Sequence, residues 1–330
     1  MGQERTITAF LPSGGTSSPR NVVQNVAVDA FALILGMLAL GMLFARLKAF
    51  PENATEVLNK VVLYLCLPAS VLTYVPRLHL EWRLLGLAVT PWLLMLATWA
   101  LVWAGSRVLR LDRQRQGVLL ICVALGNTSF IGYPMVRALL GESALPYAVV
   151  YDQFGTFVLL STFGLYVLAA YSGDTRPGPR QMLERVLRFP PLWALLFALT
   201  LMPAQPPHWI GAALKSLSDA MLPLVMLAVG LSLQLKLPRE ELPALGYGLL
   251  LKLVLLPALA LPLCWLFGLT GAALQVNVLE SAMPTMITAA GLAMMQGLAP
   301  RLAAALVAYG IVLSLVTLPA WLAVLRVLAA

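Results

Sequence analysis

Apolar residues along the chain gather in ten long runs, separated by charged residues, glycine and proline. A helix that crosses a bilayer needs about 20 such residues, and most of the runs reach that length. None of them alternates between polar and apolar residues, as the strands of a transmembrane barrel do. The pattern predicts an all-α polytopic membrane protein with ten transmembrane helices, numbered spans 1 to 10 in chain order. They cover residues 25–45, 55–76, 84–105, 116–140, 145–171, 187–203, 208–234, 243–267, 272–297 and 301–328.

Composition supports a membrane protein. Of the 330 residues, 60% are hydrophobic and 11% are charged, whereas a soluble domain has about 25% charged residues. This excludes both a soluble globular protein and a disordered one. Residues 1–24 are polar, rich in Ser, Gly and Pro, and lack the apolar stretch of a secretory signal. We therefore predict a mobile N-terminal tail, followed by a first span that anchors the chain without cleavage.

The distribution of positive charge predicts an orientation. Of the 22 Lys and Arg residues, 14 lie in the loops that follow odd-numbered spans, and 6 lie on the other side, termini included. Cytoplasmic loops carry the excess of Lys and Arg, so the odd loops are predicted to be cytoplasmic and both termini extracytoplasmic. This distribution explains the net charge of +8 without a nucleic-acid partner. The three cysteines lie inside apolar runs and predict no disulfide framework.

Two spans contain a polar, helix-breaking patch near their centre. Span 4 carries GNTSFIGYP, from Gly126 to Pro134, and span 9 carries ESAMPT, from Glu280 to Thr285. The patches are offset by five spans, an odd number, so the two halves of the chain would be inverted relative to each other in the membrane. Inverted repeats with paired broken helices are typical of secondary transporters. We predict two inverted five-helix repeats, 25–171 and 187–330, joined by a basic cytoplasmic loop, 172–186.

The broken spans are the predicted substrate site. Irregular backbone within a membrane persists only inside protein or beside a wet cavity. If both helices unwind, each second half begins with free N–H groups and a positive dipole end, so the two ends together favour an anion. The alternative is two proline-kinked helices whose Ser and Thr hydroxyls satisfy the freed carbonyls. The predicted substrate-binding residues are Gly126, Asn127, Thr128, Ser281, Pro284 and Thr285.

Ionisable residues inside spans are costly, so each is expected to face the protein interior and to have a partner. Lys215 and Asp219 are spaced i, i+4 and are predicted to form an ion pair. Glu280 lies one turn before Pro284, and Asp152 lies in the span after the first break. A carboxylate beside hydroxyl and amide oxygens suits Na⁺ or a proton, so Glu280 and Asp152 are the predicted coupling residues.

Three stretches resemble the auxin efflux carrier family, which includes plant auxin carriers and bacterial malonate permeases. They are GNTSFIGYP, then YDQFG at 151–155, and ESAMPTMITAAGLAMMQG at 280–297. The resemblance extends over most of 25–328. It implies a fold related to the bile acid sodium symporters, in which spans 4 and 9 cross where they are unwound. It further implies that spans 1, 2, 6 and 7 form a scaffold and the homodimer surface, and that spans 3–5 and 8–10 form a moving core.

Individual residues follow this resemblance. Asn127 and Thr128 match the polar pair at the first break, and Pro284 matches the crossover proline of the second, whereas Gly126 stands where the plant carriers have a proline. The long hydrophilic loop of many plant carriers is absent, which favours a small metabolic acid over auxin. Glu280-Ser281-Ala282-Met283 resembles the symporter stretch whose Glu coordinates Na⁺, which implies a possible Na⁺ site at Glu280, Asn127 and Thr128. The plant carriers work without sodium, so Na⁺ and H⁺ coupling both remain open.

The predicted function is secondary active or facilitative transport of a small organic carboxylate, malonate-like or auxin-like. Transport would proceed by elevator-type alternating access across the plasma (inner) membrane, with the lipid bilayer and a second copy of the chain as partners. The alternatives are a channel or a membrane sensor that binds a ligand, because broken helices also build filters. An intramembrane lipid or isoprenoid enzyme is disfavoured, because the sequence has no DDxxD, HxxxH or HExxH motif. We predict no enzyme activity and no cofactor beyond the coupling ion.

Overall fold

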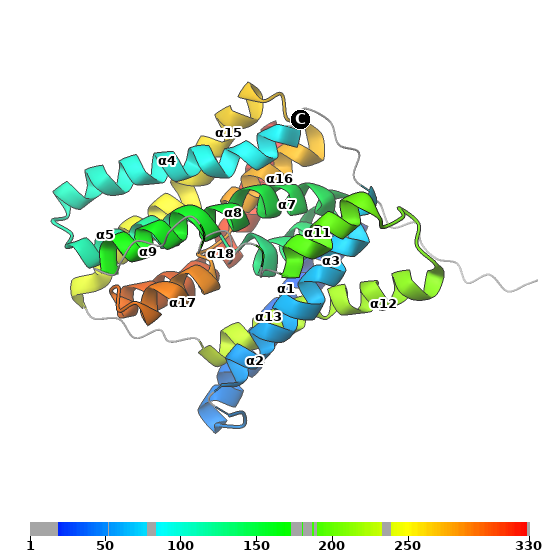
Figure 1. The fold of residues 1–330 in the computed structure, drawn as a ribbon, viewed down its shortest axis with the longest axis horizontal. Helices are drawn as coiled ribbons and strands as arrows, with labels where there is room; N and C mark the ends of the chain where they lie inside the picture. Colours follow the sequence, from blue (N-terminus) through cyan, green and yellow to red (C-terminus); the bar gives the residue numbers. More distant parts are fainter. Residues whose placement is uncertain are drawn as a thin grey trace, which may run out of the picture.

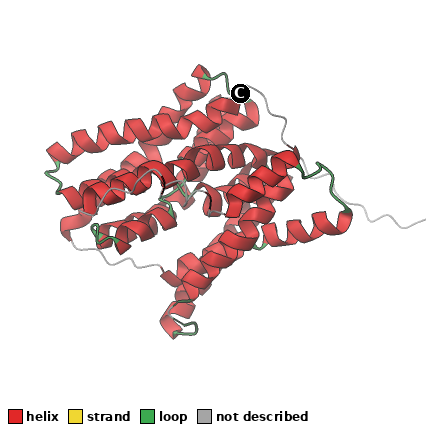
Figure 2. Cartoon of the chain, viewed as in Figure 1, coloured by secondary structure: helices red, strands yellow, loops and turns green. Residues whose placement is uncertain are grey.

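The computed structural model describes residues 19–51, 53–77, 84–172, 180, 187, 190–232 and 239–328. Within these residues all regular elements are helices, and the one pairing of the β type is an isolated bridge (Figure 2). This confirms the all-helical fold class. Most of the predicted tail and of the loop 172–186 lies outside the described residues.

Each of the ten predicted spans coincides with helical structure. In the first half, the helices are α1 (Pro19–Leu47), α2 (Ala54–Val61), α3 (Leu67–Tyr74), α4 (Leu85–Val108), α5 (Arg113–Ala124), α6 (Tyr133–Leu140), α7 (Leu145–Tyr151), α8 (Phe157–Leu159) and α9 (Leu165–Ser172). In the second half they are α11 (Pro190–Thr200), α12 (His208–Asp219), α13 (Met221–Ser232), α14 (Leu242–Leu250), α15 (Leu256–Leu266), α16 (Gly271–Ser281), α17 (Ile287–Met295) and α18 (Pro300–Leu328). Helix α1 covers Pro19–Leu47, so the last six residues of the predicted tail, 19–24, are helical.

Six of these helical segments are long and apolar enough to cross a membrane. They cover Ala54–Tyr74, Leu85–Val108, Glu142–Ser172, His208–Leu231, Arg239–Leu266 and Pro300–Leu328. Spans 4 and 9 fall short because each is broken near its middle, into α5 and α6 and into α16 and α17. The chain is thus an all-helical, multi-pass membrane protein.

Prolines coincide with wide turns in several of the long helices. The π-helical turns η1 (Val62–Cys66), η4 (Thr128–Gly132) and η9 (Leu251–Leu255) are each followed by a helix with proline at its second position. Proline has no N–H to donate, so it is tolerated where the preceding turn has already interrupted the regular hydrogen-bond ladder. The helices continue past these points as one span.

The helices pack as two groups (Figure 1). In the first, α1 runs along α13, α13 packs on α2, and α11 and α12 pack on α3. Helices α1 and α13 meet at Gly41 and Gly230, where a Cβ on Gly41 would lie 2.7 Å from the Cα of Gly230. We call α1, α2, α3, α11, α12 and α13 the first group.

The second group holds both broken spans. Here α4 packs on α5, α15 on α16, α17 on α18, and α14 on both α5 and α18. We call α4 to α9 and α14 to α18 the second group. Contacts between the groups include those of α6 with α1 and of η4 with α13, so the first broken span lies at the boundary.

Candidate functional site

The two breaks pair with each other. Helix α5 ends at Ala124 and α16 ends at Ser281. The Asn127 N–H donates to the Pro284 carbonyl (2.7 Å) and the Met286 N–H donates to the Leu125 carbonyl (3.0 Å). Between these bonds, Gly126 and Thr285 lie opposite each other in an antiparallel bridge. Each unwound segment therefore satisfies backbone groups of the other, which a bilayer interior cannot do.

This pairing brings two helix starts together. The π-turn η4 begins directly after Asn127, and α17 begins directly after Met286. The first N–H groups of a helix have no acceptor within it and carry a partial positive charge. A cavity of about 210 Å³ is lined by both starts, with Asn127 and Ser129 on one side and Met286 and Thr288 on the other.

The cavity is small and mostly apolar. Its remaining lining residues are Leu63, Leu67, Phe130, Asp152, Phe157, Leu160, Ser161, Leu165 and Leu292. Sites for drug-sized ligands measure about 300–1,000 Å³, so this volume suits a molecule of a few heavy atoms. A few polar groups in an apolar wall are what orients a small ligand in such a site.

Asp152 borders this cavity as an acceptor of three hydrogen bonds. Its Oδ1 accepts from the Thr128 hydroxyl (2.5 Å), and its Oδ2 accepts from the Tyr133 hydroxyl (3.0 Å) and from Nε2 of Gln153 (2.8 Å). The side chain is fully buried. Three donors directed at one carboxyl group fix its position.

Glu280 has different surroundings. Its side chain is fully buried, and neither carboxylate oxygen has a hydrogen-bond partner among the described residues. The carboxylate packs against Gly132, where a Cβ would lie 2.8 Å from Oε1. Lys252 is 3% exposed, and its ammonium group lies near the Glu280 backbone: a Cβ on Gly126 would lie 3.0 Å from Nζ of Lys252 and 3.5 Å from the carbonyl oxygen of Glu280. A carboxylate, a second carboxylate and an ammonium group thus lie buried around the paired breaks.

The predicted site residues meet at the breaks, but most of their side chains point elsewhere. Of the six predicted substrate-binding residues, only Asn127 lines the small cavity in the described part of the chain. The Thr285 hydroxyl donates to the Cys122 carbonyl (2.9 Å), and the Ser281 hydroxyl donates to the Asn277 carbonyl (2.7 Å) and contacts the Tyr151 hydroxyl. Gly126 and Pro284 contribute backbone.

Two polar lining residues in the first turns after the breaks were missing from the prediction, as was Ser161 in span 5. Ser129 is part of the quoted GNTSFIGYP patch, and Thr288 lies in the first turn after the second break. The signal that could have found them is position: the first turn of a helix after a break presents its side chains beside the free N–H groups.

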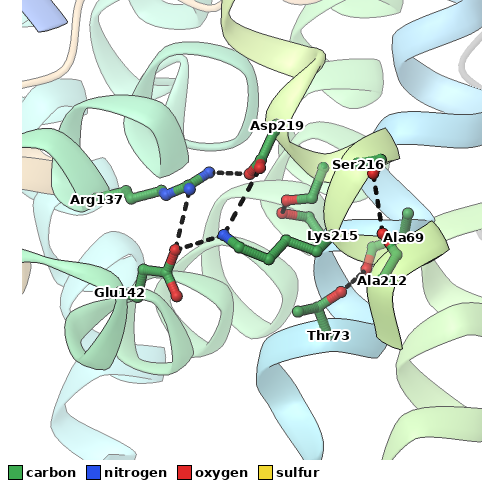
Figure 3. A network of polar contacts seen from close by, with 10 residues as sticks. Ala69, Thr73, Arg137, Glu142, Ala212, Lys215, Ser216 and Asp219 are labelled. Carbon is green, nitrogen blue, oxygen red and sulfur yellow. Dashed lines mark hydrogen bonds and ion pairs between the residues drawn. The ribbon is translucent and has the colours of Figure 1, made fainter. Parts of the chain in front are cut away.

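A second, larger cavity is lined by Tyr133, whose hydroxyl donates to Asp152 at the small cavity. It measures about 570 Å³, and an ion-pair network borders it (Figure 3). Arg137 pairs with Asp219 and Glu142, and Lys215 pairs with Glu142 (2.7 Å) and Asp219 (3.6 Å). This confirms the predicted pairing of Lys215 with Asp219, and it links α6 of the second group to α12 of the first.

The three predicted Na⁺ ligands have different surroundings from one another. Thr128 directs its hydroxyl to Asp152, Asn127 lines the small cavity, and Glu280 lies against Gly132. The described residues contain no group of three or more His, Cys, Asp or Glu side chains placed to hold a metal ion.

Comparison with known proteins identifies the family. Residues 26–322 match the family described as "Membrane transport protein". The chain is 30% identical over 298 residues to an uncharacterized transporter of Methanothermobacter thermautotrophicus, covering 88% of this chain and 96% of that one. It is 26% identical over 276 residues to an uncharacterized transporter of Methanocaldococcus jannaschii, covering 79% and 86%.

A third relative carries a substrate in its name. A protein of Rhizobium meliloti named "Putative malonate transporter" is 27% identical over 237 residues, covering 68% of this chain and 72% of its own. Membership of a transporter family confirms that the chain is not an enzyme, and it implies a small-molecule substrate. The chain belongs to the membrane transport protein family, which is the family of the auxin efflux carriers.

Proposed function

We propose that the chain is a secondary active or facilitative carrier of a small organic carboxylate anion. The observation that carries this proposal is the pair of helix starts, η4 and α17, that border one cavity of about 210 Å³. Their free N–H groups and positive ends favour a carboxylate without a buried arginine. Asn127, Ser129 and Thr288 add polar side chains to this cavity. The name of the Rhizobium relative makes malonate the first substrate to test.

Two inverted five-helix repeats would explain the paired breaks. The breaks interrupt the fourth and the ninth of ten helical spans, and each is followed by a helix that starts at the crossing point. An odd offset of five spans inverts one half relative to the other, as in known secondary transporters. With ten crossings the termini share a side, and the Lys and Arg distribution favours the extracytoplasmic side of the plasma (inner) membrane.

The two groups of helices support an elevator-type mechanism. In this proposal the first group is the scaffold, which also forms the homodimer surface, and the second group is the moving core. Both cavities lie at the boundary. Leu63 and Leu67 close the small cavity from the first group, and Ser70 and Ser218 line the large one from the same group. A displacement of the core along this boundary would change which of the two cavities opens onto the backbone of the paired breaks, where the substrate binds.

Charge balance favours a coupling ion. Asp152, Glu280 and Lys252 are all buried, and their formal charges sum to one negative charge. A carboxylate substrate adds further negative charge to a poorly solvated site, which is costly unless a cation enters with it. We propose that Asp152 and Glu280 are the residues whose charge is neutralised during transport, by a proton or by Na⁺.

The test is uptake by purified protein in liposomes. Radiolabelled malonate, other dicarboxylates and monocarboxylates are offered with and without a Na⁺ gradient and a pH gradient. We expect saturable uptake of at least one carboxylate, with counterflow, which a channel would not show. The variant Asn127→Ala is expected to abolish uptake while the yield of folded protein is unchanged. Asn59→Ala, in α2 and away from the cavity, is the matched control.

The outcomes separate the alternatives. Wild-type uptake by the Asn127→Ala variant would remove the crossing point from the substrate site. Uptake that neither saturates nor shows counterflow would indicate a channel. Binding of a carboxylate, seen as thermal stabilisation, without any uptake would indicate a sensor. If no carboxylate is bound or moved, the anion site itself is refuted.

A further inference from the structure

A hydrogen bond joins residues that line the two cavities. Tyr133, the first residue of α6, lines the large cavity of about 570 Å³. Its hydroxyl donates to Oδ2 of Asp152 (3.0 Å), and Asp152 lines the small cavity of about 210 Å³. In the described part of the chain, the two cavities share no lining residue. The contact between Tyr133 and Asp152 is therefore a polar connection from one cavity to the other.

Tyr133 differs from the other two donors to Asp152. Thr128 and Gln153 also donate to the carboxylate, but neither lines either of these cavities. A phenol hydroxyl both donates and accepts hydrogen bonds, so it can give up one proton and take another. An amide such as Gln153 has no proton that it can pass on in this way. Of the three donors, Tyr133 is the one suited to deliver a proton from a cavity to Asp152.

Gln153 can serve Asp152 in either protonation state. Its Nε2 donates to Oδ2 of Asp152 (2.8 Å) and lies 3.5 Å from the Tyr133 hydroxyl. Its Oε1 is buried and has no partner among the described residues. A half-turn of the amide would present this oxygen as an acceptor to a protonated Asp152. The surroundings of Asp152 thus suit a carboxyl group that gains and loses a proton.

The charges near this pair make protonation useful. The three donors to Asp152 are all uncharged, and the nearby ionisable groups are Glu280, packed against Gly132, and Lys252, beside Gly126. A carboxylate substrate in the small cavity would face the negative charge of Asp152, which lines the same cavity. Like charges repel strongly where water is excluded. A proton on Asp152 would remove this repulsion.

We propose that Tyr133 is a proton relay from the large cavity to Asp152, which is protonated as a carboxylate substrate enters the small cavity. The Tyr133 O–H bond breaks as an O–H bond forms on Oδ2 of Asp152. A hydronium ion in the large cavity returns a proton to the Tyr133 oxygen and becomes water. Tyr133 ends unchanged, and Asp152 gains one proton and loses its charge. This inference rests on the proposed function and deepens it, because it assigns H⁺ as the coupling ion.

Infrared spectroscopy after a rapid drop in pH tests the relay without any substrate. The protonated-carboxyl band that is missing in Asp152→Asn reports Asp152. Tyr133→Phe keeps the ring but has no hydroxyl, so the band should appear about 10-fold more slowly, or slower still. Tyr151→Phe is the matched control: it removes a buried hydroxyl that contacts Ser281 instead of Asp152, and it should protonate Asp152 at the wild-type rate.

Uptake of radiolabelled malonate in liposomes tests the coupling. The ratio of uptake driven by a pH gradient to counterflow exchange should fall about 10-fold or more in Tyr133→Phe. A merely structural role of Tyr133 would lower both rates alike and leave this ratio unchanged. The ratio should also stay at the wild-type value in Tyr151→Phe.

Several results would overturn the proposal. One is a wild-type rate of Asp152 protonation in Tyr133→Phe; another is an unchanged ratio of pH-driven uptake to exchange. If Tyr133→Phe does not fold, fluorotyrosine at position 133 decides, because it keeps the hydroxyl and makes it a stronger acid. Asp152 should then be protonated faster, and an unchanged rate would refute the relay. Malonate uptake that ignores the pH gradient would refute the relay and leave the carrier, whereas a relay seen by infrared without any carboxylate uptake would refute the proposed function alone.

Discussion

Gly132→Ala tests directly whether the Glu280 carboxylate occupies the space beside the first break. Gly132 ends the π-turn η4. A Cβ built on it would lie 2.8 Å from Oε1 and 2.9 Å from Cδ of Glu280. Ordinary contacts of this kind begin at 3.4 Å, and Oε2 would lie closer still than Oε1, so the carboxylate would have to retreat by more than about 0.6 Å within a packed interior.

The expected cost follows from packing. Adding a methyl group to a filled interior costs about 1–3 kcal/mol. Replacing glycine by alanine within a helix stabilises the folded protein by about 1 kcal/mol. Gly291→Ala, in α17, offers a matched control because nothing lies within 4 Å of its added Cβ. Both variants gain the same helix stabilisation from alanine. The difference between their free energies of unfolding should therefore be the packing cost of about 1–3 kcal/mol, with Gly132→Ala the less stable.

Two measurements check this prediction. Unfolding of each purified variant is followed by intrinsic fluorescence of the 8 tryptophans, and uptake is measured in liposomes. We expect Gly132→Ala to lose uptake as well as stability, because the displaced carboxylate lies beside the crossing point. If Gly132→Ala matched Gly291→Ala in both stability and uptake, Glu280 would not lie where the structure places it.

Two further predictions follow from the buried centre and from the first group of helices. Asp152→Asn keeps the size of the side chain but can no longer lose and regain a proton. We expect it to abolish uptake driven by a pH gradient while counterflow exchange persists, and pH-driven uptake at the wild-type rate would exclude Asp152 from coupling. Gly41→Ala would place a Cβ 2.7 Å from the Gly230 Cα, a backbone atom that cannot yield, and should lower the free energy of unfolding by about 1–3 kcal/mol. Gly36→Ala on the same helix meets nothing within 4 Å and should raise stability by up to about 1 kcal/mol; equal midpoints for these two variants would contradict close packing of α1 on α13.

The positions of the breaks could be predicted because they depend on local chemistry. Glycine and the polar residues after it end a helix, and Pro284 lacks the N–H that would continue one. The structure ends α5 at Ala124 and α16 at Ser281, within a turn of the predicted patches. The Lys215–Asp219 pair was predictable for the same reason, since residues four apart on a helix are neighbours.

The directions of the side chains could not be predicted from the sequence, because they depend on partners far away in the chain. The Thr285 hydroxyl donates to Cys122, 163 residues earlier, and the Ser281 hydroxyl meets Tyr151, 130 residues earlier. The sequence indicates that these hydroxyls need acceptors, but it does not indicate toward which neighbouring helix they point. The burial of Lys252 is a similar case, since only the packing of α14 and α15 against the breaks shows that its ammonium group cannot reach water.

The mutual hydrogen bonds of the two breaks have a consequence for transport. Asn127 donates to Pro284 and Met286 donates to Leu125, so neither unwound segment can change shape without leaving backbone groups of the other unsatisfied. The helix starts, Asp152 and Glu280 all belong to the second group of helices, and the first group contributes mainly the apolar wall at Leu63 and Leu67. A substrate held at the helix starts would therefore keep its polar contacts while the apolar wall slides past it. A rigid site that moves as one unit against an apolar surface is the arrangement that an elevator-type carrier requires.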